Sequence, residues 1–132
     1  MKATKEQIIE IGCKIVKDIY KDEYLENTIV VKQRKVNLYF PNNSSEYYEH
    51  DGWLFMVDST HSYGDMNDSH LIDILDTGEP VNLSIASGDG GNSSSKAIIK
   101  SLTGKYIVID REDYFKHHNF DFTKKEFVKR KF

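Results

Sequence analysis

The stretch of residues 87–96 is rich in glycine and serine and has the residue types of a phosphate-binding loop. A glycine-rich turn that follows a strand and precedes a helix presents backbone N–H groups that can hold a phosphate, and Lys96 would add a positive charge. The spacing matches neither GxxxxGK[ST] nor GxGxxG, the two nucleotide-binding fingerprints. A nucleotide- or phosphate-binding loop, with or without hydrolysis, is therefore one hypothesis, and a plain connection between strands is the other. The candidate ligand contacts are Ser87, Gly88, Gly90, Gly91, Asn92, Ser94 and Lys96, with His61 and His70 expected nearby.

Residues 58–70 form a second polar stretch, which contains His61, Asp65, Asp68 and His70. These residue types can bind a metal ion or move a proton. Their spacing contains neither the HExxH helix of zinc enzymes nor the loop of an EF-hand, so nothing in it fixes the geometry that a metal requires. The sequence therefore assigns no catalytic residue, no metal site and no cofactor, and we interpret residues 59–67 as a polar loop.

Aromatic and acidic residues lead to a different hypothesis, in which the chain binds another protein. The sequence contains eight tyrosines, whose apolar ring and polar hydroxyl suit sheet faces and the rims of interfaces. Exposed aromatic and acidic side chains can anchor and steer a basic partner. We favour a small binding protein, of the inhibitor, immunity or phage anti-defence type, that uses a Tyr-rich, acidic surface. The candidate partner contacts are Glu46, Tyr47, Tyr48, Glu49, Trp53 and Tyr63.

Charge and cysteine content limit the other classes of function. The 18 basic and 21 acidic residues give a net charge of -3, which provides no general attraction to nucleic acid or to an anionic membrane. Basic residues crowd the last ten positions, but docking of this end on nucleic acid is the least favoured hypothesis. Cys13 is the only cysteine, so a disulfide within the chain is excluded. With no signal peptide or long apolar stretch, we expect a cytoplasmic protein.

Residue patterns predict the elements that would position these side chains. Thr4 and Gln7 form a capping box, and the apolar residues that follow it at helical spacing predict an amphipathic helix over residues 4–24. The apolar stripe consists of Ile8, Ile11, Ile15 and Ile19, widened by Ile9, Val16 and Tyr20. β-Branched and aromatic runs predict strands at 53–57, 81–85 and 105–110, and either one long strand or a hairpin at 28–40. Residues 96–102 are either a helix or, as we prefer, the first arm of a hairpin that turns at Thr103-Gly104.

Two short helices complete the predicted elements. The first passes through residues 68–75 and ends at Gly78 and Pro80. The second begins at a capping box of Thr123 and Glu126. Because strands and helices do not alternate regularly, we predict a single α+β domain over residues 1–132, with a long N-terminal amphipathic helix packed on a mainly antiparallel sheet and a short C-terminal helix.

Overall fold

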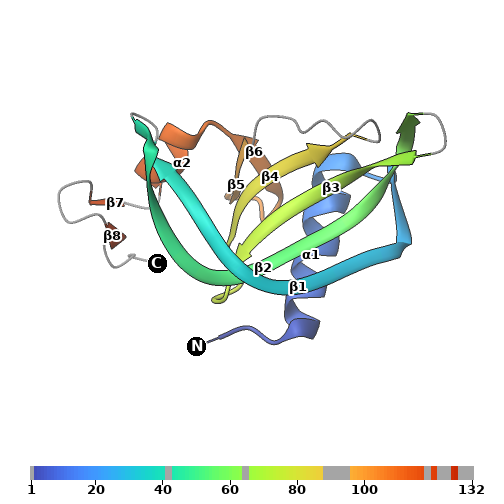
Figure 1. Ribbon diagram of the computed structural model, residues 1–132, viewed down its shortest axis with the longest axis horizontal. Helices are drawn as coiled ribbons and strands as arrows, with labels where there is room; N and C mark the ends of the chain where they lie inside the picture. Colours follow the sequence, from blue (N-terminus) through green and yellow to red (C-terminus); the bar gives the residue numbers. More distant parts are fainter. Residues whose placement is uncertain are drawn as a thin grey trace.

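Six antiparallel strands form one sheet in the order in which they occur along the chain (Figure 1). A computed structural model describes residues 2–40, 43–63, 66–87, 96–117, 120–121 and 126–127. The strands are β1 (Tyr24–Phe40), β2 (Asn43–Tyr63), β3 (Met66–Leu75), β4 (Pro80–Ala86), β5 (Lys96–Lys100) and β6 (Tyr106–Ile109). Each strand pairs with the next, so the prediction of an α+β fold with a mainly antiparallel sheet is confirmed.

The N-terminal helix α1 (Lys5–Tyr20) starts at the predicted capping box. The Thr4 hydroxyl accepts from the Gln7 N–H at 3.2 Å, and the Gln7 side chain accepts from the Thr4 N–H at 2.8 Å. The helix ends four residues before the predicted residue 24, because Tyr24 already pairs with Ser59 in β2. Its fully covered side is made by Ile8, Gly12, Ile15 and Val16.

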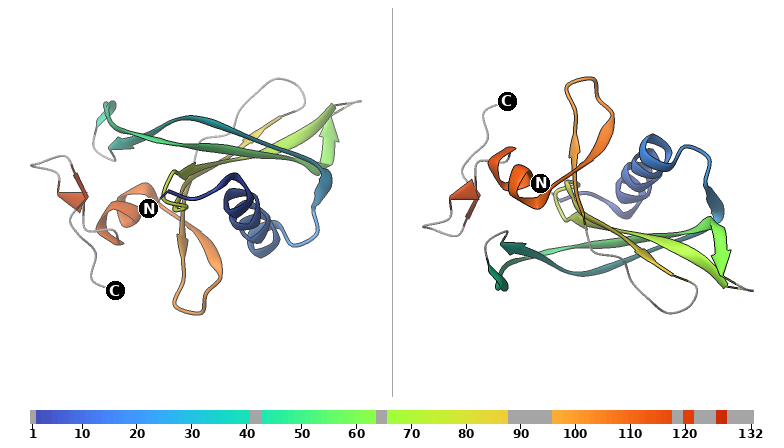
Figure 2. Two further views of the ribbon diagram at one scale, coloured as in Figure 1. Left: turned by 90° about the horizontal axis from the view of Figure 1, so that it is seen from below. Right: turned by 90° about the horizontal axis from the view of Figure 1, so that it is seen from above.

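The second helix, α2 (Arg111–His117), lies on the opposite side of strands β5 and β6 from α1 (Figure 2). Adjacent residues of β5 point to opposite faces, and here Ile98 belongs to the core under α1 whereas Ala97 belongs to the core under α2. The α1 core also contains Phe55 and Val57 of β2. The α2 core consists of Val36, Leu75, Val81, Ala97, Tyr114 and Phe115.

The predicted polar loop and short helix over residues 59–78 are wrong, because this region is mainly strand. β2 continues to Tyr63, after an irregularity in its pairing between Asp58 and Ser62, and β3 begins at Met66. Within β3, Ile72 and Ile74 are buried while the residues before each of them are half-exposed, which is the period-2 pattern of a strand. Gly78 ends no helix; it takes a φ of 95° in the turn that joins β3 to β4.

The hairpin prediction for residues 96–109 is confirmed, since β5 and β6 pair from Ala97–Ile109 to Lys100–Tyr106. A short helix near the C-terminus is also present, but it is α2 and not a helix beginning at Thr123. Glu126–Phe127 form strand β8, which pairs with β7 (Phe120–Asp121), and Thr123 lies outside the described residues. No helix in the described part of the chain is long and apolar enough to cross a membrane.

Candidate binding site beside the β1–β2 arm

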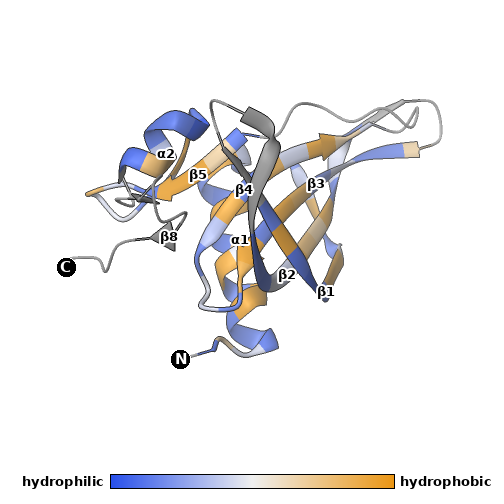
Figure 3. Ribbon diagram, turned by 60° about the vertical axis from the view of Figure 1, so that its left-hand side comes forward, coloured by the Kyte–Doolittle hydropathy of each residue, from blue (hydrophilic) through white to orange (hydrophobic). Residues whose placement is uncertain are grey.

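The longest regular pairing in the sheet joins β1 and β2 without a break from Val30–Met56 to Tyr39–Tyr47. We call this two-stranded stretch the β1–β2 arm. Figure 3 shows hydrophilic stretches along it, next to the more apolar strands at the centre of the sheet. On β1, residues 32–35 read Lys-Gln-Arg-Lys and all four are exposed.

A pocket of about 450 Å³ lies between the N-terminal segment and the arm. Trp53, half-buried against the α1 core, forms part of its wall and pairs with Gln33 across the strands. The N-terminal segment is held in place because the Ala3 N–H donates to the Asp76 carbonyl at 2.7 Å. The pocket is lined by Lys2, Ala3, Gln33, Arg34, Lys35, Asp51, Gly52, Trp53 and Asp76. Its volume lies in the range of ligand-binding pockets, and it can accept a large side chain of a partner.

Charged groups of both signs surround the pocket. Lys35 forms an ion pair with Asp51, directly opposite it on β2. The hydrogen bond from Lys35 lowers the pKa of the Asp51 carboxyl, and the same bond raises the pKa of Lys35. The Nδ1 atom of His50 lies 3.5 Å from the carboxylate of Asp76. The acidic surface expected from the sequence is therefore balanced locally by the cations of β1.

The structure brings together some of the predicted partner contacts and separates others. Glu49 is exposed and lies on the same face of β2 as Asp51 and Trp53, because residues two apart share a face. Tyr63 is at the other end of β2, where it pairs with Met66. The backbone of β2 also places Tyr47 and Tyr48 in the arm and Glu46 directly beyond its end. The side chains of these three candidates and that of Tyr63 lie outside the described part of the structure.

The two predicted histidines converge on one residue, Glu23, which precedes β1. His61 Nε2 lies 3.2 Å from the Glu23 carboxylate, and His70 Nε2 lies 3.2 Å from the Glu23 backbone carbonyl. His70 is only 3% exposed and stacks on Tyr20 with ring centroids 3.8 Å apart, so it faces the protein interior and not a ligand at the surface.

Only part of the candidate phosphate-binding loop can be placed. Ser87 follows β4 at the same end of the sheet as His70, since His70 pairs with Ile85. Lys96 is exposed at the start of β5, opposite Leu83. The remaining candidates lie outside the described residues: Gly88, Gly90, Gly91, Asn92 and Ser94. No group of three or more metal-binding side chains occurs in the part that the structure describes.

The buried position of His70 predicts an acid-sensitive fold. Burial lowers the pKa of His70, whereas in the unfolded chain the imidazole takes up a proton near its ordinary value of 6.5. Below that pH the unfolded state binds more protons, so His70 reduces the free energy of unfolding as the pH falls. We expect urea denaturation to show a smaller loss of stability between about pH 7.5 and pH 5 in His70→Gln than in the wild type. His61→Gln, at an exposed site, is the control; an equal pH dependence in wild type and His70→Gln would contradict the assignment.

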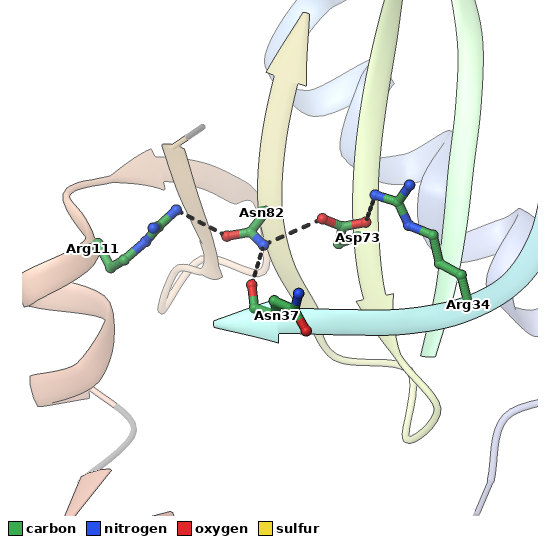
Figure 4. Close-up of polar contacts among 5 residues, drawn as sticks. All are labelled: Arg34, Asn37, Asp73, Asn82 and Arg111. Carbon is green, nitrogen blue, oxygen red and sulfur yellow. Dashed lines mark hydrogen bonds and ion pairs between the residues drawn. The ribbon is translucent and has the colours of Figure 1, made fainter. Parts of the chain in front are cut away.

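A row of polar side chains crosses the sheet on the face that α2 covers (Figure 4). Arg111 donates to the Asn82 amide oxygen at 3.2 Å, and the Asn82 amide nitrogen lies 3.3 Å from both the Asp73 carboxylate and the Asn37 carbonyl. Arg34 closes the row through an ion pair with Asp73 at 2.6 Å. No role was predicted for these residues from the sequence, because their only local sign is the presence of polar residues, Asp73 and Asn82 among them, inside two apolar runs, 71–75 and 81–85.

Comparison with known proteins gave no match: neither a protein-family model, nor a curated protein, nor a solved structure is significantly similar to the chain.

Proposed function

We propose that the chain is a small binding protein, of the inhibitor, immunity or phage anti-defence type, that binds another protein through the β1–β2 arm. The observation that supports this proposal is the pocket beside Trp53, which lies on the same side of the arm as the charged residues Glu49 and Asp51. Tryptophan is among the residues that contribute most to protein interfaces, above all where it borders a pocket that a partner side chain can fill.

The charged groups beside this pocket suit the recognition of another protein. The ion pair between Lys35 and Asp51 is solvent-exposed, with side chains 62% and 58% accessible. Exposed pairs of this kind contribute little to stability, so a partner can compete for either charge at little cost. The proposed surface is thus aromatic and of mixed sign: its acidic groups on β2 suit basic side chains of the partner, and its cations on β1 suit acidic ones.

The experiment is affinity capture from the native host with the immobilised chain, quantified by mass spectrometry. We expect a host protein that the wild type retains and that the double variant Glu49→Lys/Asp51→Lys retains about tenfold less, equivalent to about 1.4 kcal/mol. Both residues are exposed, so the melting temperature should change little.

The double variant Asp22→Lys/Glu26→Lys is the matched control, because it makes the same two charge reversals at exposed residues outside the arm. It should retain the partner as the wild type does. Equal retention by the double variant and the wild type, or equal loss in the control, would show that the arm is not the binding surface.

A further inference from the structure

The two edges of the sheet differ in how far they are open to another strand. The six-stranded sheet ends at β1 and at β6. β6 has only four residues, and its first N–H, that of Tyr106, donates to the Asp18 carboxylate of α1 at 3.0 Å. β1 has 17 residues and, within the described part of the chain, pairs only with β2 (Figure 1). The edge of β1 is therefore the longer and the less protected of the two.

Exposure along β1 marks the open part of this edge. A strand with one covered face alternates between buried and exposed residues, whereas residues 32–35 are all exposed. Val30 is also 47% exposed. The open part begins after the irregular pairing between Leu25 and Val30, and it ends where the Asn37 carbonyl accepts from Asn82. Residues 30–35, which we call the open edge, have about the length of an average strand.

The charge of the open edge decides which strand can pair with it. Its charged residues are three cations, Lys32, Arg34 and Lys35, in a chain that is acidic overall. A second copy would place cation against cation in any register that pairs the four exposed residues, and like charges opposite each other destabilise a sheet. Arg34 and Lys35 already pair with Asp73 and Asp51 of the same chain, so the uncompensated charge of the open edge is that of Lys32. Lys32 forms no ion pair with any residue that the structure describes.

We propose that the open edge of β1 binds an extended, acidic segment of the partner protein, which pairs with β1 as a seventh strand of the sheet. This inference rests on the proposed function, because it specifies how the partner binds. Main-chain hydrogen bonds would provide affinity, and alternate side chains would provide specificity. Gln33 and Lys35 line the pocket beside Trp53, so a side chain of the added strand on that face lies next to the pocket.

Backbone pairing is tested with the full chain and fluorescein-labelled peptides of the sequence Thr-Glu-Val-Glu-Val-Glu-Thr, by fluorescence anisotropy. N-methylation of every central residue blocks both edges of the peptide, whereas methylation of alternate residues leaves one edge free. We expect the fully methylated peptide to bind at least about tenfold more weakly than the parent, and the alternately methylated peptide to bind as the parent does. Equal binding of all three, or binding of none, would overturn the proposal.

Charge selection is tested with Lys32→Glu, which should weaken binding of the acidic peptide about tenfold and strengthen binding of the matching peptide with lysine in place of glutamate. Lys5→Glu makes the same change at an exposed residue of α1 and is the control; it should alter the binding of neither the acidic nor the lysine peptide. If the chain self-associates and Lys32→Glu abolishes this, the occupant of the open edge is a second copy and the proposal is overturned. If a single-stranded oligonucleotide displaces the acidic peptide, the occupant is a nucleic acid and the proposal is overturned as well.

The two proposals fail separately. If the Glu49→Lys/Asp51→Lys variant loses a host partner but the peptides do not bind, the arm is a binding surface and strand addition is wrong. If the peptides bind as expected but no host protein distinguishes the arm variants, the open edge accepts acidic strands and the proposed site on β2 is wrong.

Discussion

Replacing Gly12 by alanine is expected to lower the free energy of unfolding by about 2 kcal/mol, although alanine is the better helix former. In an exposed helix interior, this substitution stabilises a protein by about 1 kcal/mol. In α1, however, an added Cβ at Gly12 would lie 2.2–2.5 Å from three ring atoms of Phe55, a residue with no exposed surface. Overpacking of a closed core costs up to about 3 kcal/mol, so the clash outweighs the gain in helix propensity.

Urea denaturation of single and double variants measures this effect. Phe55→Leu should cost stability alone but remove part of the penalty of Gly12→Ala, and a double-mutant cycle should give a coupling of about 1 kcal/mol or more. Gly104→Ala is the control for backbone strain, since Gly104 has a φ of 87° and no atom within 4 Å of the added Cβ; it should cost about 1 kcal/mol. A more stable Gly12→Ala would mean that α1 does not pack closely on β2.

This glycine shows what the helix pattern could and could not predict. The spacing of the apolar residues and the capping box located the start of α1 to within one residue. The same pattern indicated an apolar stripe of Ile8, Ile11, Ile15 and Ile19, widened by Ile9, Val16 and Tyr20. Of the four buried positions, only Gly12 lies outside this stripe. A glycine has no apolar side chain to contribute to a periodicity, so its close contact with Phe55 is visible only in three dimensions.

The error at β3 has a different physical cause. The apolar residues of this segment recur at the helical spacings of three and four: Leu71, Ile72, Ile74 and Leu75. Ile72 and Ile74 also alternate with polar or half-exposed neighbours as in a strand, and a run this short cannot separate the two patterns. The long-range pairing of Phe55 with Ile72 and of Ile72 with Leu83 decides the outcome. Local propensity is overridden when strands on both sides offer a partner.

The candidate site was predictable only as single residues. Trp53 and Glu49 were identified by residue type, and the structure places them on one face of the arm. The pocket itself also needs Lys2, Ala3 and Asp76, which come from the N-terminal segment and the turn after β3. No spacing along the chain indicates that these segments meet. The polar row in Figure 4 was missed for the same reason, because the side-chain amide of Asn82 in β4 connects it to residues of β1, β3 and α2.

The amide of Asn82 is expected to be the most important group of that row, and Asn82→Leu should lower the free energy of unfolding by about 2–3 kcal/mol. Asn82 is 7% exposed, and its side chain contacts Arg111, Asp73 and the Asn37 carbonyl. Leucine has a similar size but removes the hydrogen bonds at once, and each polar group left unsatisfied in a buried site costs about 1–3 kcal/mol. In this variant Arg34 still pairs with Asp73, so the expected loss of stability is smaller than the sum of the costs for all three partners of Asn82.

Asn82→Asp separates hydrogen bonding from packing, because the change keeps the shape of the side chain and removes its N–H donors. At neutral pH the introduced carboxylate would face the Asp73 carboxylate, and like charges at this distance raise the pH at which the pair takes up a proton. The folded state would then bind more protons than the unfolded state, so the variant should regain stability relative to the wild type as the pH falls from about 7 to 5. Asn82→Leu should show no such recovery. Equal stability of the three proteins at neutral pH would mean that the row contributes nothing to joining α2, β1 and β4.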